Sequence, residues 1–383
     1  MYRIPEWRGF PLEEKYRKFE AVFEGKPICK AEDFPIVAYC PTYFCFGSNR
    51  PAEYFTDPAV MLKCQTDGAL AHLENVDDDF IPYFMPWLGT GLLASAFGCE
   101  VRFPDTPGAD PSVVSTGIKS VKDIARLKIP DPECDGLLPL LLRFIDYAVI
   151  HGDLPVGLSD MNSPLSTAAQ ICGYDNFFLW MYDEPDAIHE LMAKVCEGFS
   201  RWTKAQKEHI GEPLDTSNGL QGLWAPKGLG LWVSDDDLVS ISGELYREFV
   251  VPHYNKLFKE FGGTSLHYCG VGGQQIENFL AMEDVVEINN SPLGRFDEFS
   301  RLVKAIKGKK VIGIQDIAPI DPDEYYAGLF SSVDSPDGMI MILWVCENIA
   351  MNRNGASVFL PRDVFETANT LVKSIRSQIR KLL

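Results

Sequence analysis

Positive charge is scarce in this chain of 383 residues. Lysine and arginine together number 35 against 54 aspartates and glutamates, so the formal net charge is −19. A surface this negative repels phosphate backbones and anionic lipid head groups. No basic patch with interleaved aromatic residues offsets the deficit. We therefore expect neither a nucleic acid nor a membrane surface as a partner.

Long apolar runs are also missing. No uninterrupted run approaches the roughly 18–20 residues that span a bilayer, and the N-terminal MYRIPEWRGFPLEEKYR has no apolar signal region. The ten cysteines are scattered and form no CxxC pair, which is not the density of a disulfide scaffold. We expect a soluble, cytoplasmic protein with reduced thiols.

Several catalytic signatures are absent too. The glycine runs GTGLLASAFG, GLGLW and GVGG lack the Lys-Ser/Thr of a phosphate-binding loop. No Ser-His-Asp order stands out, and the five histidines outside the strand at 265–269 lie on helix-like or turn segments. Nucleotide binding and serine hydrolase chemistry are therefore disfavoured.

What the chain does have is a regular alternation of strands and helices. Apolar segments of strand length alternate with amphipathic segments of ten or more residues, which is typical of βα units around a parallel sheet. About eight strand candidates favour a closed (β/α)₈ TIM barrel, formed as a single domain over 1–383. We expect an N-terminal helical extension at 11–27 and an inserted excursion, rich in Pro, Gly and Asp, at 98–134. The strand candidates are 34–40, 80–89, 154–164, 219–237, 265–269, 285–290, 310–317 and 339–346. Two prolines confine the candidate at 80–89 to an edge or irregular position.

One strand carries a pair of candidate metal ligands. SLHYC places His267 and Cys269 two residues apart, so both side chains project to the same face of the strand. Imidazole and thiolate are common zinc ligands, and strand ends on one rim are where barrels keep their chemistry. Cys346, at the end of MIMILWVC, is the expected third ligand. Three protein ligands leave zinc an open position, as in catalytic sites. The alternative from spacing alone is three buried core residues at strand ends.

Several longer segments resemble the uroporphyrinogen decarboxylase-like superfamily. EEKYRKFEAVFEGKPIC…FPIVAY is similar to its first helix and strand, and LSDMNSPLSTAAQICGYDNFFLWMYDEPDAIHELMAKV to its central segment. LHYCG and the later strand that ends in Cys346 resemble the metal signature of its zinc-dependent corrinoid methyltransferase branch. This resemblance implies a zinc-dependent transfer of a methyl group between a corrinoid and a small molecule, such as a thiol or a methoxylated compound.

The resemblance also bears on partners and on an alternative activity. No DxHxxG signature is present, so we expect the methylcobalamin-type corrinoid to be carried by a partner protein. The alternative is a decarboxylase of the uroporphyrinogen type that acts on a small carboxylated substrate. The segment CPTYFCFGSNRP, which matches the family's porphyrin pocket, has Arg50 as its single arginine and no aspartate. A polycarboxylate needs several cationic partners, which disfavours porphyrinogen decarboxylation.

Further candidates stand near other strand ends. Asp160 and Asp316 are candidate catalytic residues; a turn role for Asp160 and a capping role for Asp316 are the alternatives. Asn162, Trp87 and Trp232 are candidate cofactor-binding residues, with core packing the alternative for the tryptophans. Glu287 is either a fourth metal ligand or a buried group behind the ligands. Asp235-Asp236-Asp237 suggests a metal cluster, but consecutive side chains point apart, which favours an acidic loop at the start of a helix.

Overall fold

The centre of the molecule is a sheet of six parallel strands. The computed structural model describes residues 3–40, 51–106, 109–159, 162–220, 222–352 and 354–383. The strands lie in the order β3-β12-β11-β10-β9-β8, and every neighbouring pair is parallel. Nearly every residue in them is buried, as in sheets covered by helices. Their bounds are Ile36–Tyr39 (β3), Leu231–Ser234 (β8), Thr264–Cys269 (β9), Val285–Ser291 (β10), Val311–Ile317 (β11) and Met339–Trp344 (β12).

Two irregular segments connect the edges of this sheet, β3 and β8, into a ring. The backbone N–H of Asp79 donates to Ile36 O of β3 at 2.8 Å. Phe84 forms a parallel bridge with Val156, and Asn162 forms another with Ser234 of β8. The segments at 79–84 and 156–159, with Asn162, thus occupy the second and third strand positions. The arrangement agrees with the (β/α)₈ barrel predicted from the alternation of strands and helices.

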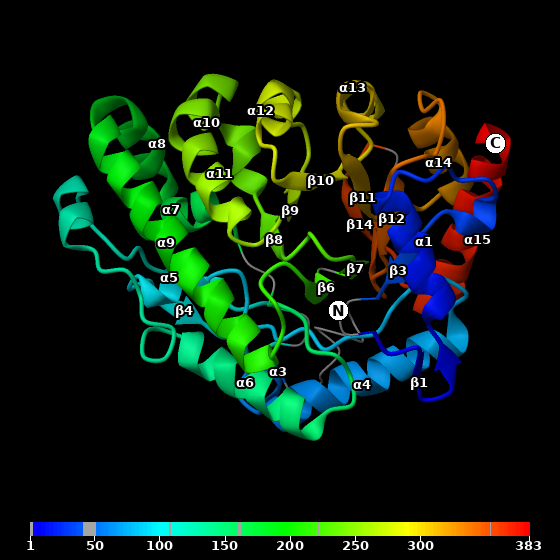
Figure 1. The fold of residues 1–383 in the computed structure, drawn as a ribbon, viewed down its shortest axis with the longest axis horizontal. Helices are drawn as coiled ribbons and strands as arrows, with labels where there is room; N and C mark the ends of the chain where they lie inside the picture. The colour runs from blue at the N-terminus through cyan, green and yellow to red at the C-terminus, as the bar shows by residue number, and fades with distance from the viewer. Residues whose placement is uncertain (1–2, 41–50, 107–108, 160–161, 221, 353) are drawn as a thin grey trace.

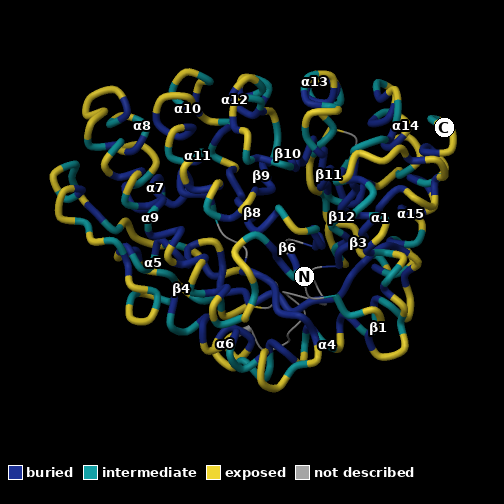
Figure 2. Tube along the Cα trace, viewed as in Figure 1, coloured by how far each residue is buried: buried dark blue, intermediate teal, exposed yellow. Residues whose placement is uncertain are grey.

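Helices surround the strands (Figure 1). Many strands are followed by a helix that covers the outer face, so that strands are dark blue and outer helical turns yellow in the burial view (Figure 2). The longest helices have apolar stripes facing the sheet and polar residues facing outward, as expected for helices that cover a core. The α-helices of five or more residues are Glu13–Phe23 (α1), Pro58–Asn75 (α4), Leu92–Ala96 (α5), Leu138–His151 (α6), Pro164–Cys172 (α7), Tyr174–Asp183 (α8), Pro185–Ile210 (α9), Gly243–Phe249 (α10), Val251–Lys259 (α11), Ile276–Ala281 (α12), Phe296–Ile306 (α13), Pro322–Phe330 (α14) and Val364–Leu382 (α15).

Short two-stranded hairpins and 3-10 turns lie outside the six-stranded sheet. The excursion at 98–134 contains the two-stranded pair β4 (Val101–Arg102) and β5 (Ser112–Val113), then the 3-10 turn η2 (Val121–Arg126). Sequence analysis did not predict the N-terminal pair β1 (Glu6–Trp7) and β2 (Phe10–Pro11) or the hairpin of β13 (Ile349–Met351) and β14 (Ser357–Phe359). Such short strands carry too few residues for a detectable alternation. The remaining elements are α3 (Pro51–Tyr54), β6 (Ser217–Leu220), β7 (Leu223–Ala225), η1 (Ala31–Asp33), η3 (Asp236–Ser240) and η4 (Gly273–Gln275).

The segment at 80–89 is irregular, as its two prolines predict. Only Phe84 bridges a neighbour, and no strand is assigned over these residues. Pro82 and Pro86 flank that bridge, and proline removes a donor that a central strand needs. The segment still keeps its place in the ring because Phe84 and its neighbours are buried.

The larger of two hydrophobic clusters extends through the barrel and its helices, from Trp7 near the N-terminus to Ile379 in α15, and the smaller includes Trp232. Within the part of the chain that the structure covers, no helix combines the length and apolar character needed to cross a bilayer.

Candidate metal centre

The candidate centre is built where β8 and β9 end. These strands are parallel neighbours, with Ser234 opposite His267, so the residue after each strand reaches the same rim. The backbone N–H of Asp235 donates to His267 O at 2.8 Å and extends the pairing by one residue. The Asp235 carboxylate is fully buried and accepts from Ser163 Oγ at 2.6 Å and Tyr246 OH at 2.7 Å. This anchorage places the next residue, Asp236, directly beside β9.

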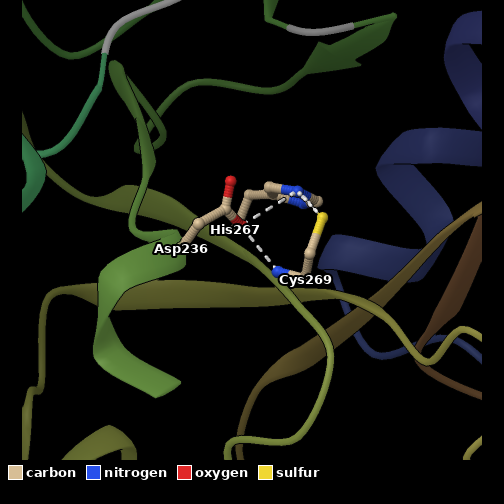
Figure 3. Close-up of side chains that lie close together, drawn as sticks. All are labelled: Asp236, His267 and Cys269. Carbon is tan, nitrogen blue, oxygen red and sulfur yellow. Dashed lines mark hydrogen bonds and ion pairs between the residues drawn. The ribbon is translucent and has the colours of Figure 1, made fainter. Parts of the chain in front are cut away.

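Three potential ligand atoms meet at this point (Figure 3). His267 Nε2 and Cys269 Sγ are 3.4 Å apart, and Asp236 Oδ1 is 3.9 Å from His267 Nε2. Asp236 Oδ1 also accepts from the backbone N–H of Cys269 at 2.7 Å. The three ligand atoms lie within 4.8 Å of one another. A nitrogen, a sulfur and a carboxylate oxygen are the donor types that zinc takes from proteins.

The orientation of His267 is set by a hydrogen bond from behind. Its Nδ1 lies 2.7 Å from Asn289 Oδ1 on β10, opposite His267 in the parallel register. An amide oxygen can only accept, so Nδ1 carries the proton and Nε2 presents its lone pair towards Cys269 and Asp236. The Trp232 ring stacks on the imidazole with centroids 5.7 Å apart and planes at 16°. A neutral histidine fixed in this tautomer is the form that binds metals.

The Cys269 thiol is held in its protonated form by its surroundings. Burial, followed by the negative charge of Asp236, raises the pKa of Cys269 to about 12. Without a cation, a thiolate here would be desolvated beside a carboxylate. A divalent cation reverses this, because it stabilises both negative groups at once. A cation bound here would therefore displace the Cys269 proton.

Gly313 on β11 has no side chain, and the side chains of Glu287 and Asn289 occupy the space beside it. A Cβ atom at Gly313 would lie 2.1 Å from Glu287 Oε1 and 2.4 Å from Asn289 Nδ2, well inside contact distance. Asn289 Nδ2 donates to Glu287 Oε1 at 3.4 Å. The Glu287 carboxyl is fully buried, and this burial raises its pKa to about 7. Glu287 thus lies behind Asn289, and it is not one of the three converging residues.

Cys346, the ligand predicted on another strand, lies elsewhere on the rim. It follows β12 by two residues, and β10 and β11 stand between β12 and β9 in the sheet. Its sulfur does not belong to the converging set found among the described residues. The Arg362 guanidinium donates to Cys346 O at 3.3 Å and Ala318 O at 3.0 Å, and also to Ile349 O. These bonds hold the Cys346 loop against the β13 hairpin.

The other predicted residues are distributed around the barrel. Trp232 is in contact with His267, as above. Asn162 is at the rim, where it bridges Ser234. Trp87 donates from Nε1 to Asp110 Oδ1 of the excursion at 3.1 Å. Asp160, like Arg50, lies outside the described residues.

Asp316 faces a helix. It is buried at the end of β11, where its carboxylate accepts a hydrogen bond from Tyr325 OH of α14. Successive strand residues point to opposite faces, so Asp316 faces the helices when Gln315 faces the interior. Burial raises the pKa of Asp316 to about 7.

Comparisons with known proteins agree with this architecture. The model of the uroporphyrinogen decarboxylase (URO-D) family matches residues 52–214. This part of the chain is therefore similar to the uroporphyrinogen decarboxylase family. That region covers helices α3 to α9, whereas the candidate ligands lie after it on β8 and β9.

The individual relatives are a decarboxylase and a methyltransferase. The chain is 26% identical over 198 residues to a uroporphyrinogen decarboxylase of Carboxydothermus hydrogenoformans, covering 49% of this chain and 50% of that protein. It is 27% identical over 191 residues to a methylated-thiol–coenzyme M methyltransferase of Methanosarcina mazei, covering 48% of this chain and 46% of that protein. The chain thus spans about half the length of these two curated relatives. A solved methyltransferase from Methanosarcina mazei shares the fold, with a TM-score of 0.65 at 17% identity over 96% of this chain and 99% of that chain.

Asp236 was predicted to belong to an acidic loop at the start of a helix, and not to the metal site. The acidic loop does begin a helical turn, since η3 starts at Asp236. The signal that could have found it is positional: the strand LWVS ends just before Asp235, and parallel strands in register end at one rim. Without knowing that LWVS and SLHYC are neighbours, the sequence offers no reason to pair their ends.

Proposed function

We propose that this protein is a methyltransferase that uses a zinc ion at the rim of the barrel. The single observation that carries the proposal is the convergence of Asp236, His267 and Cys269, with His267 Nε2 directed at the other two. The URO-D relationship supports it, because one relative of comparable identity is a methylated-thiol–coenzyme M methyltransferase. The absence of lysine and arginine from the six strands disfavours the decarboxylase alternative, which needs cations for its carboxylates.

We assign His267 and Cys269 as the fixed ligands. Asp236 joins them in the conformation described, and its side chain is 55% exposed, so it is the ligand that an incoming substrate can replace. Cys346 remains a proposed ligand, which requires the loop between β12 and β13 to bring its sulfur closer. Zinc bound here would act as a Lewis acid that favours the thiolate form of a thiol substrate.

The reaction we propose is methyl transfer between a small molecule and a corrinoid on a partner protein. In the thiol direction, the substrate thiol gives up its proton and its sulfur forms a bond to the methyl carbon. The cobalt–carbon bond breaks as it does so, and its electron pair stays on cobalt. Trp232 and His267 form one side of the rim that the substrate meets. Asn162 stands beside them through its bridge to Ser234. Asp160 and Asp316 remain proposed catalytic residues, and Trp87 remains a proposed cofactor-binding residue.

The test combines metal analysis with a spectral assay. We expect purified protein, prepared without chelators, to contain about one zinc per chain. It should demethylate methylcobalamin in the presence of at least one small thiol, with the loss of the methylcobalamin spectrum as the measurement. Protein that takes up no zinc, even when zinc is supplied, would contradict the proposal.

The hydrogen bond between Asn289 and His267 leads to a prediction about zinc affinity. Asn289→Ala removes the acceptor that fixes the His267 tautomer, and we expect zinc affinity to fall about 10–100-fold. Competition with a chromophoric chelator measures this. Asn290→Ala is the matched control, because the Asn290 amide donates to Tyr268 O and Gly270 O, backbone carbonyls of the neighbouring segment. Equal losses in the two variants would show that the effect is general destabilisation.

A further inference from the structure

Helix α8 exposes apolar side chains where a surface helix usually carries polar ones. Its inner face, with Phe177 and Met181, is buried. On its outer face, Tyr174 is 46% exposed, Leu179 is 56% exposed and Tyr182 is 71% exposed. Helices at the surface of globular proteins normally direct polar residues outward. A group of large apolar side chains on the outside is typical of a surface that binds another molecule.

These exposed residues form one stripe along the helix. Tyr174, Phe178 and Tyr182 follow one another at intervals of four residues, which places them in a row. The ring centroids of Tyr174 and Phe178 are 6.3 Å apart. Leu179 lies beside Tyr182, because residues three apart are also neighbours on a helix. We call Tyr174, Phe178, Leu179 and Tyr182 the α8 stripe.

The α8 stripe begins beside the candidate metal centre. The Tyr174 hydroxyl donates a hydrogen bond to the Asp237 carboxylate. Asp237 directly follows Asp236, which is one of the three converging residues. Helix α8 packs against α7 and α9 and lies at the periphery of the molecule (Figure 1). A molecule that covers the stripe therefore stands at the rim, next to the candidate centre.

Carboxylates border the α8 stripe. Asp175, Asp183, Glu184 and Asp186 are all exposed, and residues 174–193 contain no lysine or arginine. Helix α7, which packs against α8, has no charged residue at all. The stripe is thus an apolar surface with an acidic border.

Cations on neighbouring elements do not neutralise this border. Lys194 of α9 is paired with Glu190 at 2.8 Å. The excursion at 98–134, which approaches the turn at Gly173, contributes Lys119 and Lys122, two lysines against four carboxylates. A zinc ion at the candidate centre would itself be balanced by the carboxylate and the thiolate among its proposed ligands. The border therefore keeps a net negative charge.

The acidic border distinguishes between three possible occupants of the stripe. A second copy of this chain, meeting α8 with α8 in a two-fold dimer, would bring the same carboxylates together. A membrane surface would place them against anionic lipid head groups. A different protein, with an apolar surface bordered by lysine and arginine, complements both the stripe and its border.

We propose that the α8 stripe is the docking surface for the protein that carries the corrinoid in the proposed methyl transfer. The matching surface of that carrier has an apolar centre bordered by lysine and arginine. Docking there places the carrier beside Asp236, at the rim where the methyl group is transferred. This inference rests on the proposed function, because it is methyl transfer that requires a carrier.

The carrier itself is the probe, namely the methylated corrinoid protein of the same cells, purified by following the absorbance of its cofactor. Calorimetry gives its Kd for the full chain, and methyl transfer to a thiol gives kcat and KM. Free methylcobalamin is the parallel substrate, because it needs no docking surface. We expect the affinity of the wild type for the carrier to fall about tenfold between low and physiological salt, since the charged border is screened.

Tyr182→Ser tests the apolar part of the surface. We expect it to raise both the Kd and the KM for the carrier about tenfold, as the loss of a large aromatic contact does. Its rate with free methylcobalamin should equal that of the wild type. Ile150→Ser is the matched control, because Ile150 is 72% exposed but lies on α6.

Asp183→Lys tests the acidic border. This change at the last residue of α8 should raise the Kd for the carrier about tenfold and weaken its dependence on salt, because like charges then meet. Glu208→Lys, an equal change of charge at an exposed residue in the last turn of α9, is the matched control. We expect it to bind the carrier like the wild type.

The outcomes separate this inference from the proposed function. If the wild type demethylates free methylcobalamin with none of the thiols, the proposed function fails, and the inference fails with it. If it does demethylate free methylcobalamin, but the carrier fails to bind or binds Tyr182→Ser and Asp183→Lys like the wild type, only the docking surface is overturned. A wild-type dimer in sedimentation that Tyr182→Ser dissociates would also overturn it, since a second copy would then cover the stripe.

Discussion

Replacing Cys269 by serine is expected to lower zinc affinity by at least about 100-fold, with His267→Ala having a similar effect. The two atoms face each other at 3.4 Å and are carried by one rigid strand, so neither can be substituted by a neighbour. A serine hydroxyl is a poor zinc ligand, and in the apo protein it fits the buried site without charge. Zinc content after dialysis and chelator competition are the measurements.

Asp236→Asn and Cys346→Ser distinguish the remaining ligands. We expect a loss of about tenfold from each, because Asp236 is half-exposed and Cys346 reaches the metal only after loop movement. Wild-type affinity in Cys346→Ser would remove that cysteine from the ligand set and leave Asp236, His267 and Cys269. Wild-type affinity in Asp236→Asn would remove the carboxylate instead. Cys134→Ser, at an exposed cysteine, is the matched control for the thiol change.

Gly313→Ala is the second change with a large expected effect. The added methyl group would lie 2.1 Å from Glu287 Oε1 and 2.4 Å from Asn289 Nδ2, so both side chains must move. Displacement of Asn289 breaks its hydrogen bond to His267 and releases the ring from its fixed tautomer. We expect zinc affinity to fall about 10–100-fold, as for other changes behind metal-bound histidines. The same substitution should lower the free energy of unfolding by about 1–3 kcal/mol, as overpacking does.

A control on the opposite face of the same strand separates these effects. Ile314 is fully buried and points away from Gly313's face, towards the helices. Ile314→Val should lower the free energy of unfolding by about 0.5–1.5 kcal/mol and leave zinc affinity unchanged. Denaturant unfolding and chelator competition on both variants give the comparison. If Gly313→Ala binds zinc like the wild type, Asn289 does not control the metal ligand.

The sequence predicted those parts of the fold that depend on local periodicity. His267 and Cys269 lie side by side because a strand repeats every two residues, and this is visible in SLHYC alone. The alternation of strands and helices predicted the barrel. The break between α10 and α11 falls at Val250, two residues before Pro252, where a proline prevents a continuous helix.

The parts that the sequence did not predict depend on which strands are neighbours. Asp236 reaches the centre only because β8 pairs with β9 in a register that sets Ser234 opposite His267. Asn289 of β10 reaches His267 because β10 pairs with β9, and Gly313 of β11 lies beside Asn289 because β11 pairs with β10. Neither residue type by itself indicates a position behind a metal ligand. Register is a property of the assembled sheet, so a single sequence does not reveal it.

The uneven construction of the ring has a mechanical consequence. Six strands are joined by continuous ladders, whereas the described links between β3 and β8 through 79–84, 156–159 and Asn162 are isolated bridges and single backbone bonds. Each ladder bond must break before two paired strands can separate. The segments between β3 and β8 have fewer such bonds, so the ring should open most readily there. His267 and Cys269 stand on β9, inside the continuous ladders, whereas Asp236 follows β8 at their edge. Widening of the ring at these segments would leave the His267–Cys269 pair in place and move Asp236 first.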